Sequence, residues 1–221
     1  MEDVLDLYTA PHDPLRPLVC FDETSKQLIG ESRTPLPVAP GLPARVDYEY
    51  VRNGVSNLFM FFAPLENWRE VQVTAQRTKV EFALCMRDLV DRYFPDAVLI
   101  RIVMDNLNTH DLSALYEVFE PTEARRIINK LEIHYTPKHG SWLNMAEIEL
   151  SVLSNQCLDR RIADQERLAV ETGGWVAERN KAEATVEWRF TTADARIKLK
   201  KLYPTIKAQP SLLSENLSNA A

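Results

Sequence analysis

The stretch Ala97-Val98-Leu99-Ile100-Arg101-Ile102-Val103-Met104-Asp105-Asn106 sets the fold class of this chain. Its first eight residues form an almost continuous run of apolar and β-branched side chains, which is typical of a strand buried on both faces. Such strands belong to sheets that helices cover on both sides. The run stops at Asp105-Asn106, so the predicted strand delivers a carboxylate at its carboxyl end.

A second apolar run, 18–23, also ends in carboxylates and predicts a buried strand that carries Asp22 at its end. Four prolines at 33–43 predict a loop after it. Asn53-Gly54 is a strong hairpin-turn signal, so we expect a strand on each side of this dipeptide. The expected extended segments before the first helix are 47–52, 58–63 and 71–74.

Helical spacing follows in four segments, and Thr78 is a suitable N-cap for the first of them. The expected helices are 78–94, 112–119, 121–131 and 144–161, with a strand at 133–135 and a turn at 137–140. The order strand, strand, strand, helix, strand, helix, strand, helix predicts a mixed α/β sheet with helices on its faces. Three prolines indicate that 1–17 is an incoming linker, and the Ser- and Asn-rich 205–221 is an expected disordered tail.

Composition narrows the function classes. Hydrophobic residues make up 45% of the 221 residues and charged residues 26%, which is the balance of a soluble globular domain. No apolar run approaches the roughly 20 residues of a membrane span, and no secretory signal is evident, so we expect no membrane partner. The three cysteines are far apart and predict buried, reduced thiols. The net charge of −6 is unusual for a nucleic-acid binder, although a carboxylate metal site is itself acidic.

Three acids fall at positions that one sheet edge and one helix could bring together. Asp22 and Asp105 end predicted strands, and Glu147 lies in the first turn of the last predicted helix. Carboxylates at strand ends are suitable ligands for Mg²⁺ or Mn²⁺, and two such ions support phosphoryl transfer. Each acid alone has a plainer explanation: Asp105 can cap the next helix, and Glu147 can be first-turn charge.

Four segments together resemble the insertion-sequence 630/Tc1-mariner transposases. VMDNLNTH at 103–110 resembles the family's "DN...H" segment, and YTPKHGSWLNMAE at 135–147 resembles its "P..SP.LNP.E" segment. CFDET at 20–24 resembles the segment of the first acid, and WRFTTADAR at 188–196 resembles the closing segment of many bacterial members. The resemblance implies an RNase H-like DDE catalytic domain over 18–204.

The resemblance also implies an activity, a cofactor and partners. It implies metal-dependent cleavage at transposon ends, followed by attack of the freed 3′ hydroxyl on target DNA. Asp22, Asp105 and Glu147 would hold Mg²⁺ or Mn²⁺, two ions in all. DNA would be the partner, a homodimer is possible, and the location would be the bacterial cytoplasm, at the nucleoid. The side chains expected to support the ligands or contact DNA are Asn106, His110, Lys138, His139, Asn144, Arg189 and Arg196.

The chain departs from the family pattern in three respects. Trp142 and Met145-Ala146 replace common prolines. Glu149 is a rival third acid, but it lies about 200° around the helix from Glu147, and the Leu-Asn-x-x-Glu pattern selects Glu147. Family members carry N-terminal helix-turn-helix domains, for which there is no room before Asp22. We therefore expect a truncated protein without sequence-specific recognition of inverted repeats, which a gel-shift assay would test.

Two other functions fit the same residues. One is an inactive or repurposed DNA-binding remnant, and the other is an RNase H-like nuclease that acts in repair or on RNA. Nicking of plasmid DNA that Asp105→Ala abolishes would separate the first from the transposase. Comparison of hybrid and duplex substrates would separate the second.

Overall fold

The structure is a computed structural model that describes residues 1–43, 45, 47–107 and 110–203. It divides into two compact units, Met1–Trp188 and Arg189–Ala221. The division at Arg189 falls inside the expected 18–204 domain. The expected tail at 205–221 lies outside the described residues.

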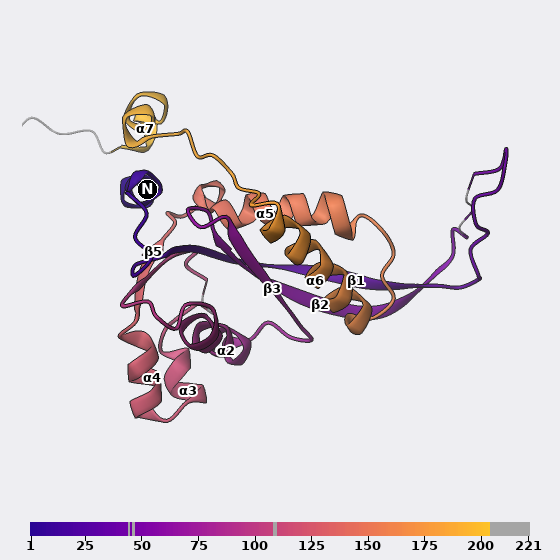
Figure 1. The fold of residues 1–221 in the computed structure, drawn as a ribbon, viewed down its shortest axis with the longest axis horizontal. Helices are drawn as coiled ribbons and strands as arrows, with labels where there is room; N and C mark the ends of the chain where they lie inside the picture. Colours follow the sequence, from indigo (N-terminus) through magenta and orange to yellow (C-terminus); the bar gives the residue numbers. More distant parts are fainter. Residues whose placement is uncertain (44, 46, 108–109, 204–221) are drawn as a thin grey trace, which may run out of the picture. The chain divides into compact units, whose positions relative to one another are not determined.

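A five-stranded sheet in the order β3-β2-β1-β4-β5 forms the first unit (Figure 1). β1, β2 and β3 pair antiparallel, whereas β4 and β5 continue the sheet in parallel with β1. This is the mixed sheet that the sequence predicts. The strands are β1 (Leu18–Glu31), β2 (Tyr50–Ala63), β3 (Trp68–Thr74), β4 (Ile100–Met104) and β5 (Leu131–Tyr135).

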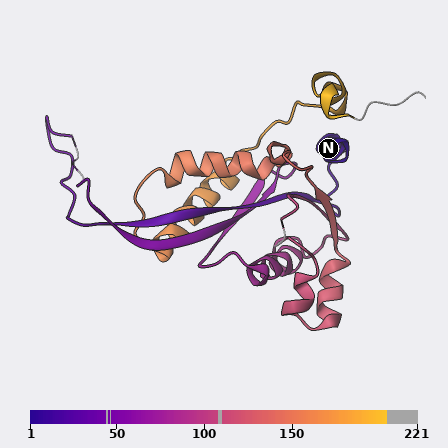
Figure 2. The same ribbon diagram turned by 180° about the vertical axis from the view of Figure 1, so that it is seen from behind.

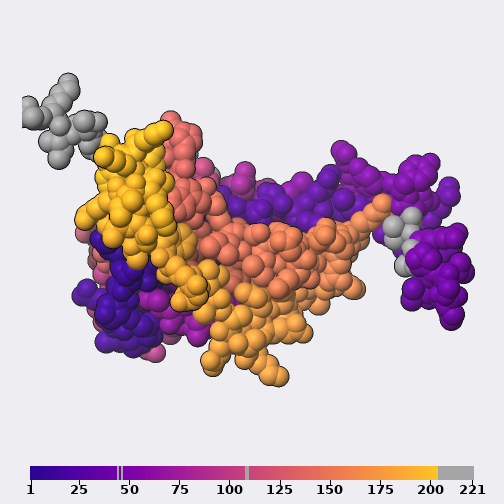
Figure 3. Space-filling model, turned by 90° about the horizontal axis from the view of Figure 1, so that it is seen from above, coloured from indigo at the N-terminus to yellow at the C-terminus, as the bar shows by residue number. Residues whose placement is uncertain are grey.

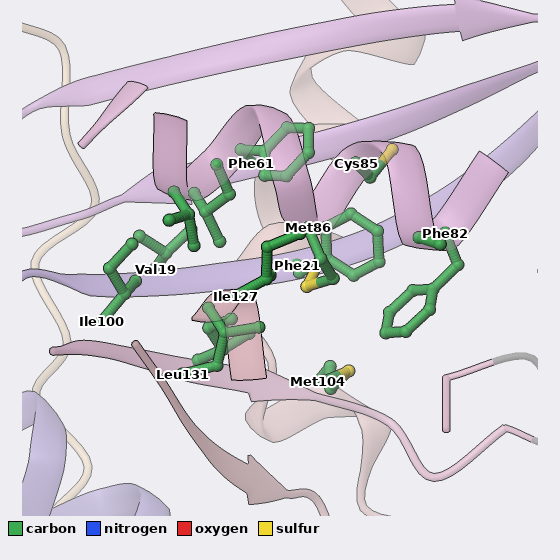
Figure 4. Packing of buried hydrophobic residues seen from close by; sticks show 14 of the residues in the cluster. Val19, Phe21, Phe61, Phe82, Cys85, Met86, Ile100, Met104, Ile127 and Leu131 are labelled. Carbon is green, nitrogen blue, oxygen red and sulfur yellow. The ribbon is translucent and has the colours of Figure 1, made fainter. Parts of the chain in front are cut away.

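Helices cover both faces of this sheet, as expected for strands with apolar side chains on both faces (Figures 1 and 2). On one face, Val19 and Phe21 of β1 pack with Phe61 of β2 and Phe82 of the first covering helix (Figure 4). This face carries α2 (Lys79–Asp88), α3 (Ala114–Val118) and α4 (Pro121–Ile128), and the other carries α5 (Met145–Leu153) and α6 (Gln165–Lys181).

Helix boundaries are close to the predicted ones where a local signal marks them. Thr78 is the N-cap of α2, as the sequence predicts, and it forms a complete capping box with Glu81. α2 and α5 are shorter than expected because a π-helical turn follows each, at Leu89–Tyr93 and Ser154–Leu158. The described residues also contain the 3₁₀ turn Ser141–Leu143 and, in the second unit, α7 (Thr192–Lys198) and the 3₁₀ turn Lys200–Leu202. No helix among the described residues is long and apolar enough to cross a bilayer.

The prediction of a linker over 1–17 is wrong for its first half. Glu2–Thr9 is a helix, α1, and its side chains Val4 and Leu5 are fully buried. Together with Tyr8, these residues form one apolar face at helical spacing, so the segment has enough apolar area to pack on the sheet. The prolines that suggested a linker come only after the helix ends.

The predicted hairpin turn at Asn53-Gly54 is also wrong. β2 runs without interruption from Tyr50 to Ala63, and its register against β1 shifts between Gln27 and Ile29. Two residues, Asn53 and Gly54, therefore stand opposite one, which is a β-bulge. Gly54 has a φ of 97°, a conformation that both a turn and a bulge can require, and pairing with β1 decides between them. Because β1 and β2 have 14 residues each and β4 has 5, the β1–β2 pair continues past β4 as a two-stranded ribbon (Figure 1). In the space-filling view of Figure 3, the segment that joins the two strands projects beyond α5 and α6.

Candidate active site

The three acids lie where β1, β4 and α5 come together. The parallel pairing of β1 with β4 ends at Cys20 and Val103, and two residues further along each chain are Asp22 and Asp105. The prediction that Asp22 ends its strand is wrong, because antiparallel pairing with β2 extends β1 to Glu31. Asp105 directly follows β4, and Glu147 lies in the first turn of α5.

Asp22 interacts electrostatically with both of the other acids. Burial is the largest cause that raises the pKa of Asp22, to about 7, and repulsion from Glu23, Asp105 and Glu147 adds to it. A hydrogen bond from the backbone N–H of Glu23 acts in the opposite direction. Asp22 is therefore a carboxyl group whose negative charge is disfavoured until a cation or another positive group balances it.

Asn144 connects the strand of the first acid with the helix of the third. It is the N-cap of α5, and its side-chain oxygen accepts a hydrogen bond from the N–H of Ala146. Its amide nitrogen donates to the carbonyl oxygen of Phe21 at 2.8 Å and lies 3.5 Å from an Asp22 carboxylate oxygen. The buried amide thus fixes Glu147, three residues on, relative to Asp22.

Tyr8 of α1 holds the same segment from another side. Its buried hydroxyl donates to the carbonyl oxygen of Leu143 at 2.6 Å and accepts from the N–H of Met145 at 3.4 Å. The ring also packs against Trp188, with 5.0 Å between ring centroids. This contribution of Tyr8 was not predicted from the sequence, because 1–17 was expected to be a linker.

Glu149, the rival third acid, is bound in the interior. Its side chain is fully buried, with one oxygen 2.7 Å from Arg179 and the other 3.6 Å from the buried Arg69. The two arginines balance the negative charge of Glu149, and its side chain is directed at them and not at the other acids. The geometry therefore favours Glu147 as the third acid.

A groove of about 440 Å³ opens beside Asp105. It is lined by residues that follow β4 and β5, and the loop after β5 makes its far wall. Gly140 closes that loop in a tight turn, where a Cβ atom would lie 2.6 Å from the Pro137 ring. The expected turn at 137–140 is therefore confirmed. The lining residues include Asp105, Asn106, Lys138 and His139, and so join four of the predicted site residues.

His110 lies behind Asp105, with its side chain 1% exposed. Its Nε2 is 2.9 Å from Glu23, and its Nδ1 is 2.7 Å from Asp105 Oδ1. Burial by itself lowers the pKa of His110, but the contacts with Asp105 and Glu23 outweigh it and raise the pKa to about 10. Glu23 has no place in the sequence-based site. In the sequence, only its position next to Asp22 pointed to Glu23, because its partner His110 is far away along the chain.

The donor set suits a divalent cation. In the part of the chain that the structure describes, no three His, Cys, Asp or Glu side chains are grouped closely enough to hold a metal ion as they stand. Yet the donors are hard carboxylate oxygens, which Mg²⁺ and Mn²⁺ prefer. Asp105 Oδ1 is buried 2.7 Å from His110 Nδ1, so the other carboxylate oxygen of Asp105 is the one left for a cation. A cation would also relieve the repulsion on Asp22.

Two other sequence predictions have different outcomes. All three cysteines are free and buried, as expected. Arg189 and Arg196 belong to the second unit, and their contact with DNA stays a prediction.

Comparison with known proteins identifies the family. The family model for DDE superfamily endonucleases matches residues 17–169, and the chain belongs to this family. The fold is similar to that of the Mos1 mariner transposase in its paired-end complex with Mn, with a TM-score of 0.56 and 16% identity. The Mos1 strand transfer complex gives 0.55 at the same identity.

These matches cover 82% of this chain but only 54–55% of the Mos1 chain. The chain therefore spans about half the length of the transposase whose fold it shares. No curated protein matches it in a sequence comparison. The RNase H-like sheet and the DDE family that the sequence resemblance implied are confirmed.

Proposed function

We propose that this chain is the catalytic domain of a DDE transposase, which cleaves transposon ends and joins them to target DNA. The observation that carries the proposal is the placement of the three acids: Asp22 lies in β1 two residues beyond its pairing with β4, Asp105 directly follows β4, and Glu147 lies in the first turn of α5, whose N-cap Asn144 contacts Asp22. Membership of the DDE endonuclease family and the Mos1-like fold support it. We assign the catalytic domain to 18–204 together with α1, and place the protein at the bacterial nucleoid.

Asp22, Asp105 and Glu147 would be the ligands of two Mg²⁺ or Mn²⁺ ions. Bound there, such ions would activate the attacking oxygen and stabilise the leaving oxygen of a phosphodiester. The chain's own part is to hold the carboxylates in place. Asn144 sets Glu147 relative to Asp22, and the buried Glu149 keeps its charge away from the site.

The groove beside Asp105 is the proposed path of the scissile strand. Lys138 and His139 line it and would face the phosphates, while Asn106 stands next to the second acid. A lysine ammonium contributes to DNA affinity by neutralising phosphate charge. Arg189 and Arg196 would extend the contact with DNA from the second unit, and the active form would be a homodimer on two transposon ends.

Plasmid nicking and strand transfer test this proposal. With Mg²⁺ or Mn²⁺ the protein should nick supercoiled DNA and join a 3′-hydroxyl end to a target, and EDTA should stop both reactions. Asp105→Ala should remove both activities. Asp88→Asn, which removes a carboxylate at the C-terminal end of α2, should retain them. Cleavage of RNA–DNA hybrids without strand transfer would instead indicate a nuclease of another function.

A further inference from the structure

Glu23 is a buried carboxylate that the proposed chemistry does not use. Its side chain is 3% exposed, and Oε2 lies 2.9 Å from His110 Nε2. The opposite ring nitrogen of His110 lies 2.7 Å from Asp105 Oδ1. One imidazole thus bridges two carboxylates, one from β1 and one from the residue after β4.

The strand geometry places this bridge behind the metal ligands. Successive side chains of a strand point to opposite faces, so Asp22 meets Asn144 on the α5 face, whereas Glu23 faces the α2 side. There His110 stacks on Phe82, with ring centroids 5.2 Å apart and planes inclined by 28°. The bridge therefore supports Asp105 from the opposite side of the sheet.

The surroundings leave the imidazole little freedom. Phe21 presents a second ring at 5.6 Å, inclined by 65°, so two aromatic side chains fix the ring plane. Arg77 Nη1 is 3.7 Å from the other oxygen of Glu23, which balances the second negative charge of the bridge. Buried charges are retained when they are paired in this way.

The bridge determines which part of Asp105 is available. Its Oδ1 is buried against His110, yet the side chain is 27% exposed, so the exposure falls on its other atoms. Asp105 is one of the residues that line the groove. We propose that Glu23 is a positioning residue that acts through His110 to direct the second carboxylate oxygen of Asp105 toward the metal site.

This inference rests on the proposed function. Glu23 would orient a metal ligand through a hydrogen-bonded neighbour, as the residues behind metal ligands commonly do. The loss of such a partner typically weakens metal affinity by about 10–100-fold. The positioning of Asp105 depends on the length of the Glu23 side chain and not on its charge alone. If that side chain is shortened by one methylene, the 2.9 Å contact with His110 is lost unless the imidazole ring moves.

Mn²⁺ affinity, measured by calorimetry on the full chain without DNA, tests the inference. Glu23→Asp keeps the negative charge but withdraws it from His110, and we expect the Kd for Mn²⁺ to rise at least about 10-fold. Glu149→Asp is the matched control, because it shortens another fully buried, ion-paired glutamate that contacts none of the three acids. It should leave the Kd within about 2-fold of the original chain while it lowers thermal stability.

The outcomes separate the two levels of the proposal. Equal affinity of Glu23→Asp and the original chain, or an equal loss in both variants, would overturn the positioning role while the proposed function stands. Absence of Mn²⁺ binding by the original chain would instead overturn the metal site itself. Circular dichroism checks the fold, and if Glu23→Asp does not fold, His110→Gln carries the same test with the same expected loss.

Discussion

Glu147 and Glu149 illustrate how surroundings give two nearby acids opposite roles. Glu147→Gln should lower metal-dependent nicking by more than about 100-fold, because a proposed ion loses a ligand, and should leave unfolding in urea almost unchanged. Glu149→Gln should lower the free energy of unfolding by about 3–5 kcal/mol, because it leaves the fully buried Arg69 without its counterion. A large loss of stability in Glu147→Gln together with a large loss of nicking in Glu149→Gln would contradict the choice of Glu147 as the third acid.

Asp22 gives the metal-free protein a characteristic pH dependence. Its pKa is raised to about 7 in the folded state from an ordinary value near 3.8, so the folded protein keeps a proton that the unfolded chain releases. Stability should therefore fall as pH rises from about 4 to about 7. Asp22→Asn removes this loss and should be more stable than the original chain at pH 8, by on the order of 2–4 kcal/mol, but not at pH 4.

Urea unfolding in EDTA at the two pH values measures this difference. Asp88→Asn controls for the loss of a carboxylate elsewhere. Parallel stability curves for Asp22→Asn and the original chain would show that the carboxyl group is not buried among like charges.

Among the elements, α1 holds the proposed site, because Tyr8 forms hydrogen bonds with the segment that precedes Glu147. Tyr8→Phe should lower the free energy of unfolding by about 1–2 kcal/mol, since two buried backbone groups lose their partner. It should also reduce nicking several-fold, because Asn144 lies in that segment. Tyr116→Phe, at an exposed tyrosine, should change neither. Full nicking activity of Tyr8→Phe would confine α1 to a stabilising role.

Elements with a complete local signal could be predicted from the sequence. The apolar run before Asp105 and the capping residue Thr78 carry their information within a few residues, and both predictions are confirmed. Asn53-Gly54 could not be decided locally, because a tight turn and a bulge need the same backbone conformation and only β1 distinguishes them. Glu23 was missed for a related reason, since its partner His110 becomes its neighbour only in the folded chain.

The net negative charge of the whole molecule should limit its affinity for DNA. The chain carries a net charge of −6, and the proposed strand path passes three carboxylates. The variant Asp22→Asn/Asp105→Asn/Glu147→Gln removes three negative charges, from −6 to −3. In EDTA it should bind duplex DNA roughly 10-fold more tightly than the original chain, because fewer phosphates face repulsion.

Fluorescence anisotropy at several salt concentrations measures this affinity. The control variant Asp96→Asn/Glu166→Gln/Glu178→Gln removes as many charges from exposed positions. It should change the affinity less, since screening weakens distant charges. Equal gains in the two variants would mean that DNA does not pass the three acids.

Crystals grown with Mn²⁺ and measured at wavelengths around the manganese absorption edge show whether the three acids bind metal ions together. We expect anomalous peaks between β1, β4 and α5, with Mn²⁺ bound by carboxylate oxygens of Asp22, Asp105 and Glu147. Manganese bound elsewhere, with these three side chains turned away from one another, would contradict it.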